Sequence, residues 1–162
     1  MKKFFSFFAA ILFAGSMMAA DATLAAGTNA SEAAVNGFAG IKAGTSKATG
    51  EITVTVGANA ASLTLYAAAW NNTTPTMTVA APEGVTITPA SVALTANSGI
   101  SNNPPFTLSE GTDIETFKCE FTISGATEGA TFTLTADKRF VVWGATYETG
   151  EGGGEQPVDP EP

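Results

Sequence analysis

The feature that most constrains the fold is a stretch in which apolar and polar residues alternate strictly. Its apolar members are Phe117, Cys119, Phe121 and Ile123, and its polar members are Lys118, Glu120 and Thr122. Successive side chains of a β-strand point to opposite faces, so this stretch predicts a strand with one buried face and one solvated face. The region around it shows no helical periodicity, and we therefore expect the chain to fold from strands.

Turn residues divide the surrounding region, residues 37–149, into short pieces of the same kind. Gly, Pro or Asn interrupts it every 8 to 12 residues, between stretches rich in Thr, Val, Ile and Phe, and this rhythm is typical of an all-β sandwich. Strands are expected around residues 51–56, 63–66, 77–79, 85–87, 92–94, 117–123, 132–134 and 140–148. The sequence predicts one all-β domain, an antiparallel β-sandwich of about eight or nine strands in two packed sheets.

The segments on either side of this domain differ from it in composition. Residues 1–20 begin with lysines, continue with an apolar stretch and end in small residues, which is typical of a cleaved signal peptide. The apolar run is shorter than the roughly 20 residues of a membrane-spanning helix. Residues 21–36 are small and Ala-rich, which indicates a flexible lead-in. Residues 150–162 combine Gly, Pro and acids, as a solvated linker or tail does.

Composition excludes several classes of function. The chain contains no His, which excludes Ser-His-Asp and Cys-His nucleophiles as well as His-ligated zinc. Its formal net charge is −8, so we expect no nucleic-acid partner, because phosphate binding requires a clustered Lys/Arg surface. The single cysteine, Cys119, cannot form an internal disulfide. It shares a face with Phe117 and Phe121 and is expected to be an inert, buried thiol.

Four short stretches, taken in order, carry a resemblance to a known family. They read IKAGTS from residue 41 with GEITVTV from residue 50, LTLYAAAWN from residue 63, TFTL from residue 131 and KRFVVWGA from residue 138. These stretches resemble the galactose-binding-like jelly-roll modules of secreted, often multidomain bacterial proteins. The resemblance implies a jelly-roll sandwich and a binding or accessory role. Members commonly carry an Asp soon after KRF, which is absent here, so no role of that Asp is transferred.

Two aromatic rings and two amides form the candidate binding site. Tyr66 and Trp70 lie four residues apart in an expected strand, so they share the face opposite to the neighbouring leucines. If the leucines point into the core, both rings point outward. Exposed rings beside Asn71 and Asn72 would stack on sugar rings and hydrogen-bond their hydroxyls. The alternative is packing, because a local bulge would turn Trp70 inward and Trp is usually buried, and we favour packing.

Other candidate residues are expected to be structural. Trp143 and Tyr147 lie on the last strand, both faces of which are apolar, so we expect both rings to pack. Glu110, Asp113 and Glu115 form an acidic cluster of the kind that can bind calcium, but their spacing matches no EF-hand and no metal site is predicted. No pair of carboxylates is identified that would cleave a glycoside, so the protein is not expected to be an enzyme.

We interpret the chain as a non-catalytic accessory module that is secreted, held at the cell surface or periplasmic. Its expected partner is a polysaccharide or other glycan, bound weakly and without a cofactor, and another domain or protein is expected beyond the C-terminal linker. One competing hypothesis is a structural or adhesive spacer with no small ligand. Another is a truncated fragment of a larger secreted protein. Burial of all four Tyr and Trp rings, with no groove of convergent polar groups, would favour the spacer.

Overall fold

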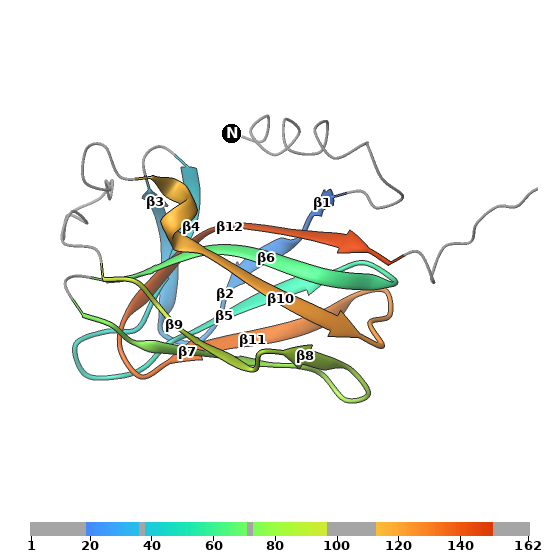
Figure 1. Ribbon diagram of the computed structural model, residues 1–162. Coiled ribbons are helices and arrows are strands. Elements are labelled where there is room, and N and C mark those ends of the chain that lie inside the picture. The colour runs from blue at the N-terminus through green and yellow to red at the C-terminus, as the bar shows by residue number, and fades with distance from the viewer. Residues whose placement is uncertain (1–18, 36–37, 71–72, 97–112, 151–162) are drawn as a thin grey trace, which may run out of the picture.

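The protein folds into two antiparallel sheets that pack face to face, as the computed structural model shows (Figure 1). The structure describes residues 19–35, 38–70, 73–96 and 113–150. The seven strands of the larger sheet are β1 (Ala19–Asp21), β3 (Ala30–Val35), β4 (Phe38–Ala43), β6 (Ala60–Ala69), β8 (Thr86–Thr88), β10 (Lys118–Ser124) and β12 (Phe140–Thr149). The five strands of the smaller sheet are β2 (Thr23–Ala26), β5 (Glu51–Val56), β7 (Thr76–Ala80), β9 (Ser91–Ala93) and β11 (Ala130–Ala136). The predicted antiparallel β-sandwich is confirmed.

The order of the strands is that of a jelly roll. It runs β3-β4-β12-β6-β10-β8 in the larger sheet and β2-β5-β11-β7-β9 in the smaller one. The antiparallel pairs β4–β12, β5–β11, β6–β10 and β7–β9 are nested within one another along the chain. This nesting arises when one long hairpin is rolled up into two Greek keys. The jelly-roll fold implied by the family resemblance is therefore confirmed.

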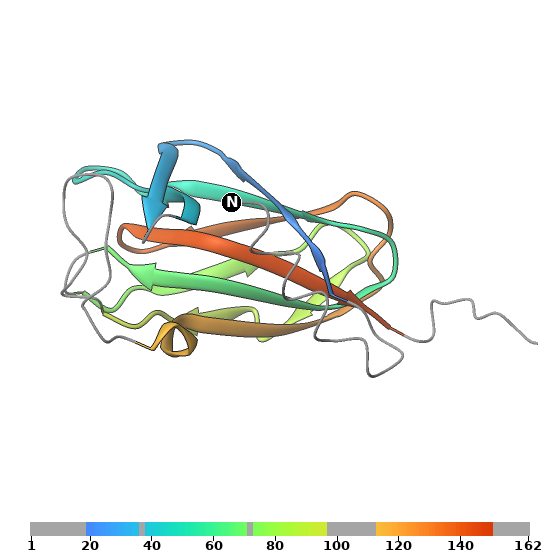
Figure 2. The same ribbon diagram turned by 90° about the horizontal axis from the view of Figure 1, so that it is seen from above.

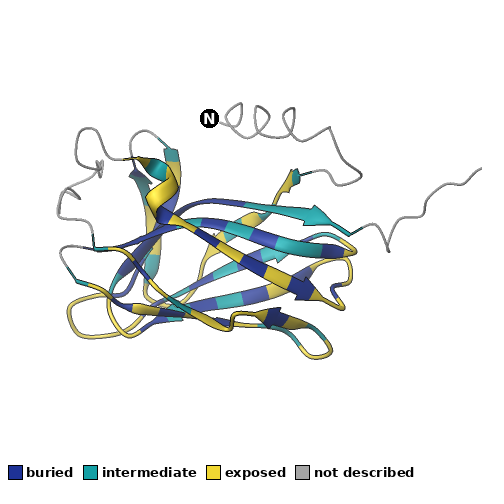
Figure 3. Cartoon of the chain, viewed as in Figure 1, coloured by how far each residue is buried: buried dark blue, intermediate teal, exposed yellow. Residues whose placement is uncertain are grey.

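Buried and more exposed residues alternate along the strands (Figure 3), and the buried ones form the core between the sheets. Ile52 and Val54 of β5 are fully buried, while Thr53 and Thr55 of the same strand are partly exposed. Leu63 and Leu65 of β6 and Phe132 of β11 are likewise fully buried. Burying one such side chain stabilises the fold by about 1.5–3 kcal/mol. The local alternation of the strands therefore supplies the apolar surface that joins the two sheets.

The strand with the strictest alternation begins one residue later than predicted. Cys119 and Phe121 point into the core as expected, but Phe117 ends a short 3-10 turn, η2 (Ile114–Phe117), and packs on the outside of the larger sheet. Asp113 caps this turn by accepting a hydrogen bond from the backbone N–H of Glu115 at 3.0 Å. Cys119 is a buried free thiol as predicted, and burial raises its pKa to about 11.

The segment expected to be a flexible lead-in, residues 21–36, contributes strands instead. β2 pairs with β5, β3 pairs with β4, and β1 just before them pairs with β12. Figure 2 shows the β1–β2 segment, in blue, crossing obliquely from one sheet towards the other. Backbone hydrogen bonds to open sheet edges hold these strands, and such bonds need no large apolar side chains. The Ala-rich composition was therefore a poor guide to order.

A second apolar cluster covers the outer face of the larger sheet. Its buried members are Val35, Ala68, Trp70, Phe117, Val141 and Trp143. β12 contains a bulge at Trp143, where the pairing with β6 skips one residue. The bulge leaves Trp143 outside, whereas Ala145 and Tyr147 beyond it pack against the inner core. Trp143 and Tyr147 therefore lie on opposite faces, although strict alternation predicted one shared face.

Candidate functional site

The aromatic pair predicted as a binding site is on the expected face but is not exposed as a pair. β6 is regular from Leu63 to Ala69, so Tyr66 and Trp70 both lie on the outer face. Trp70 is only 4% exposed because the outer cluster covers it. The packing alternative therefore describes Trp70, without the bulge that was expected to cause it. Asn71 and Asn72 lie outside the described residues.

Tyr66 is half-buried and its hydroxyl is already engaged. It donates a hydrogen bond to Oε2 of Glu115 at 3.1 Å. Burial, and then the hydrogen bond and negative charge of Glu115, raise the pKa of Tyr66 to about 12. Glu115 also lies 3.7 Å from Nζ of Lys118. The acids Asp113 and Glu115 are thus used to build η2 and to anchor Tyr66, and Glu110 lies outside the described residues.

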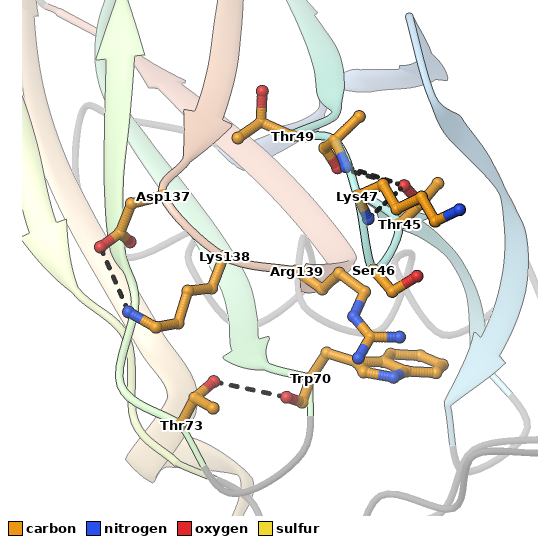
Figure 4. A pocket seen from close by; sticks show the side chains of 10 residues that line it. Thr45, Ser46, Lys47, Thr49, Trp70, Thr73, Asp137, Lys138 and Arg139 are labelled. Atoms are coloured by element: carbon orange, nitrogen blue, oxygen red, sulfur yellow. Dashed lines mark hydrogen bonds and ion pairs between the residues drawn. The ribbon is translucent and has the colours of Figure 1, made fainter.

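A groove of about 410 Å³, lined mostly by polar and charged residues, lies next to Trp70, and we call it the end groove (Figure 4). Three connections of the jelly roll line it: the loop 45–49 between β4 and β5, Trp70 and Thr73 after β6, and the turn 137–139 between β11 and β12. Three of the four stretches that carry the family resemblance therefore meet here. Their proximity could not be predicted from the sequence, because only the register of the strands brings these stretches together.

The loop 45–49 is held by its own backbone. The hydroxyl of Thr45 accepts hydrogen bonds from the backbone N–H groups of Lys47 at 3.1 Å and Ala48 at 2.9 Å, which is the pattern of a Ser/Thr turn. The Thr45 N–H also donates to the carbonyl of Ala48 at 2.8 Å. These bonds leave the side chains of Ser46 and Lys47 exposed at the groove.

The β2–β3 turn braces the base of this loop. The carbonyl of Asn29 accepts a hydrogen bond from the N–H of Gly44 at 2.8 Å, and the side-chain amide of Asn29 donates to the carbonyl of Thr49 at 3.0 Å. Gly44 has a φ of 98°, a conformation that favours glycine. A Cβ at Gly50 would collide with the backbone N of Gly44. The segment expected to be flexible therefore positions one wall of the groove.

The opposite wall is the turn 137–139, which was predicted as a polar turn. Oδ1 of Asp137 accepts a hydrogen bond from the backbone N–H of Thr76 at 2.8 Å, and Oδ2 lies 3.6 Å from Nζ of Lys138. The Thr76 hydrogen bond, with the charge of Lys138, lowers the pKa of the Asp137 carboxyl. The carbonyl of Arg139 accepts a hydrogen bond from the N–H of Trp70 at 3.1 Å. This turn is thus fixed to its neighbours on both sides.

Cations gather around the Trp70 ring. Nζ of Lys42 lies 4.8 Å from the ring centroid, within cation–π range. The side chain of Arg139 runs towards the same ring (Figure 4). Burial, and then the positive charge of Arg139, lower the pKa of Lys42. The four basic residues in or beside the end groove, here called the cation cluster, are Lys42, Lys47, Lys138 and Arg139.

A second hollow, of about 690 Å³, lies between β2 and the β3–β4 hairpin, and we call it the side hollow. Most of its lining is Ala, Leu, Ile and aromatic, and its charged members are Asp21 and Glu32. Trp143 forms part of the wall, and its buried indole N–H has no hydrogen-bond partner among the described residues. In the described part of the chain, no three Asp, Glu or Cys side chains converge as a metal site would require, and no helix is long and apolar enough to span a membrane.

No protein-family model matches the chain, and no curated protein matches it. Two solved structures resemble it at a distance. CsCBM6-3 from Clostridium stercorarium, in complex with cellobiose, is 14% identical, covers 84% of this chain and 94% of its own, and gives a TM-score of 0.41. The family 11 carbohydrate-binding module of the cellulosomal cellulase Lic26A-Cel5E of Clostridium thermocellum is 11% identical, covers 83% and 89%, and gives 0.29. Likeness at this level does not extend to a ligand or an activity.

Proposed function

We propose that this protein is an exported, non-catalytic accessory module that binds a carbohydrate in the end groove. The observation that carries the proposal is the convergence of polar groups from three connections on one hollow beside an indole ring. Hydroxyls line it from Thr45, Ser46 and Thr73, and cationic donors come from the turn 137–139. A few convergent polar groups beside an apolar surface are the usual elements of a small-ligand site, and they match the hydroxyls and apolar ring faces of sugars.

The amides that follow Trp70 in the chain belong to this proposal. Asn71 and Asn72 directly succeed a groove-lining residue. Their side-chain amides each offer both donors and an acceptor to sugar hydroxyls. Trp70 acts in this proposal as a buried support for the groove, and Tyr66 stands further along the same face of β6.

The composition of the groove argues against glycoside cleavage. Most glycosidases hold a pair of carboxylates on either side of the scissile bond. Among the described residues, one carboxylate lines the end groove, Asp137, and it accepts a hydrogen bond from Thr76 and contacts Lys138. We therefore assign a binding role and no catalytic step.

Export is proposed from residues 1–20, which have the composition of a signal peptide. Expression of the full chain with this segment in a bacterial host should give a shortened protein outside the cytoplasm. Mass spectrometry of the fractionated cells measures both the location and the new N-terminus. A full-length protein retained in the cytoplasm would contradict export while leaving the binding proposal intact.

A glycan array tests the binding function. We expect the exported protein to be retained by at least one glycan, and we expect Ser46→Trp, which fills the groove from an exposed loop, to abolish retention. The matched control is Lys118→Ala on β10, which lies outside the groove. Retention by no glycan would refute the proposal.

A second candidate function is a structural or adhesive spacer that binds no small ligand. The observation in its favour is the burial of Trp70 and Trp143, which are 4% and 2% exposed, since sugar-binding tryptophans need an open ring face. The same array separates the two functions. Failure to bind any glycan, in a protein with a cooperative thermal unfolding transition, would favour the spacer.

A further inference from the structure

We infer that the ligand of the end groove is an anionic polysaccharide, one whose sugars carry carboxylate or sulfate groups. This inference rests on the carbohydrate-binding function proposed above. The chain has a formal net charge of −8, and yet the cation cluster gathers in or beside one groove. Of the Lys and Arg residues that follow Lys3, Lys118 alone lies elsewhere. The basic residues are thus concentrated where a ligand would bind.

The fold neutralises the cation outside the groove and leaves most of the cluster without a counter-charge. Lys118 lies 3.7 Å from a carboxylate oxygen of each of two flanking glutamates. Within the described ranges, no carboxylate forms a salt bridge with Lys42, Lys47 or Arg139, and Lys138 contacts only Asp137. Gathered like charges repel one another, and a bound anion would remove this repulsion. A neutral sugar would leave it in place.

The backbone and the side chain of Arg139 are both fixed by neighbouring residues, which positions its guanidinium to bind such an anion. Its carbonyl accepts the N–H of Trp70, and its side chain packs against Gly44, where an added Cβ would lie 3.0 Å from Cγ of Arg139. Burial, and then the positive charge of Arg139, lower the pKa of Lys42, in keeping with two neighbouring cations. A guanidinium can bind a carboxylate or sulfate through two parallel hydrogen bonds. Lys47 is a further basic residue of the lining, on the exposed loop 45–49.

The size of the groove and the charge elsewhere favour a polysaccharide over a nucleic acid. A volume of about 410 Å³ lies within the range of about 300–1,000 Å³ for small-ligand sites. Duplex DNA carries one charge per about 1.7 Å of axis and needs an extended basic surface. The remainder of this chain is acidic and would repel such a polyanion. A glycan with a charge on some sugars can place an anion in the groove while neutral groups lie outside it.

Matched ligands with and without charge test the inference. Affinity electrophoresis and calorimetry of the exported protein should compare polygalacturonate with its methyl ester, and dextran sulfate with dextran. We expect one charged polymer to bind about tenfold or more tightly than its uncharged partner, and to weaken as ionic strength rises from about 0.05 to about 0.5 M. The carboxylate and sulfate pairs distinguish the two sources of charge.

Single substitutions connect the preference to the groove. Arg139→Gln and Lys47→Ala should each lower the affinity for the charged polymer about tenfold, since each removes a charged donor that would bind the anion. Lys118→Ala removes the same charge elsewhere and should change nothing. Lys47 lies on an exposed loop, so its loss leaves folding intact, and thermal melts of all three variants verify this.

Each failure has a distinct meaning. Equal affinity for charged and uncharged polymers would overturn the anionic ligand but leave carbohydrate binding standing. An equal loss in Lys118→Ala would overturn the assignment to the groove. Binding of single-stranded DNA as tightly as polygalacturonate would overturn selectivity for a polysaccharide. Failure to bind any glycan would overturn the proposed function itself.

Discussion

The end groove and the side hollow differ in chemistry although they belong to the same small sandwich. The end groove is lined by three cations and one acid, whereas the side hollow is lined mostly by apolar residues with two acids and no base. The chain has a formal net charge of −8, so a groove lined by more basic than acidic residues is unusual in it. Volume alone therefore does not identify the site, because the larger side hollow carries fewer groups that could recognise a ligand.

The difference follows from how each hollow is built. Strands and small side chains form the side hollow, and Gly40 lets β4 approach the β12 bulge. A Cβ at this glycine would lie 2.7 Å from the carbonyl of Val142 and 2.9 Å from Cβ of Trp143. Connections between strands form the end groove, and connections carry polar side chains because they are solvated. Close strand packing therefore explains the side hollow, while the end groove carries the polar side chains that can bind a ligand.

The largest losses of stability are expected for substitutions of Trp70 and Trp143. Both belong to the outer cluster, but Trp70 lines the end groove and Trp143 lines the side hollow. Trp70→Ala and Trp143→Ala should each lower the free energy of unfolding by about 3–5 kcal/mol, because each leaves a cavity in buried packing. Urea denaturation measures this loss. The milder variants Trp70→Phe and Trp143→Phe separate the regions: Trp70→Phe should weaken glycan binding and Trp143→Phe should preserve it. Equal binding by both Phe variants would contradict the assignment of the glycan to the end groove rather than the side hollow.

Two glycines provide the next test. Gly50→Ala forces a Cβ against the backbone of Gly44 in the loop of the end groove, and Gly40→Ala forces one against the β12 bulge. Each should cost about 1–3 kcal/mol of stability, as overpacking does. Glycan affinity measured below the melting temperature should fall for Gly50→Ala and stay at the wild-type value for Gly40→Ala. A loss of affinity in Gly40→Ala alone would assign the ligand to the side hollow.

The inner core could be predicted because alternation is a local property of the sequence. Ile52 and Val54 on β5, and Cys119 and Phe121 on β10, take the faces that period-two alternation assigned to them. The antiparallel sandwich followed from the same signal and from the turns between the strands. Phe117 departed from it because a cap at Asp113 starts a 3-10 turn there.

The candidate site depends on contacts between distant parts of the chain, which explains why it was only partly predicted. The face of Tyr66 and Trp70 was predicted correctly, but their cover comes from β3, η2 and the bulge at Trp143. Lys47 and Arg139 can be placed in the same groove only once β4 is known to pair with β12. The strands within residues 21–36 were not predicted, because backbone hydrogen bonds to neighbouring strands hold them and these bonds leave no strong apolar pattern in the sequence.

Removing the acid of the end groove should sharpen its cationic character. Asp137→Asn keeps the acceptor for the Thr76 N–H but removes the negative charge beside Lys138. We expect affinity for an anionic polymer to rise roughly two- to fivefold, the size of one exposed charge interaction. Glu32→Gln in the side hollow is the control and should leave affinity unchanged. Calorimetry at low ionic strength measures both, and an unchanged Asp137→Asn would weaken the case for an anionic ligand.

The smallest effect concerns the repulsion inside the cation cluster. The pKa of Lys42 is lowered by burial and by the charge of Arg139, so the folded state disfavours the protonated amine and its stability rises as the pH climbs towards the pKa of the unfolded chain. Arg139→Gln should raise the pKa of Lys42 by removing the second cause while burial remains. NMR titration of the lysine side chain measures the shift, with Lys118→Ala as a control that should not move it.

A bound anionic polymer should raise the same pKa in the wild-type protein, whereas a neutral glycan supplies no charge to do so. An unchanged pKa with a charged polymer bound would place that ligand away from Lys42 and break the link between the cluster and the groove.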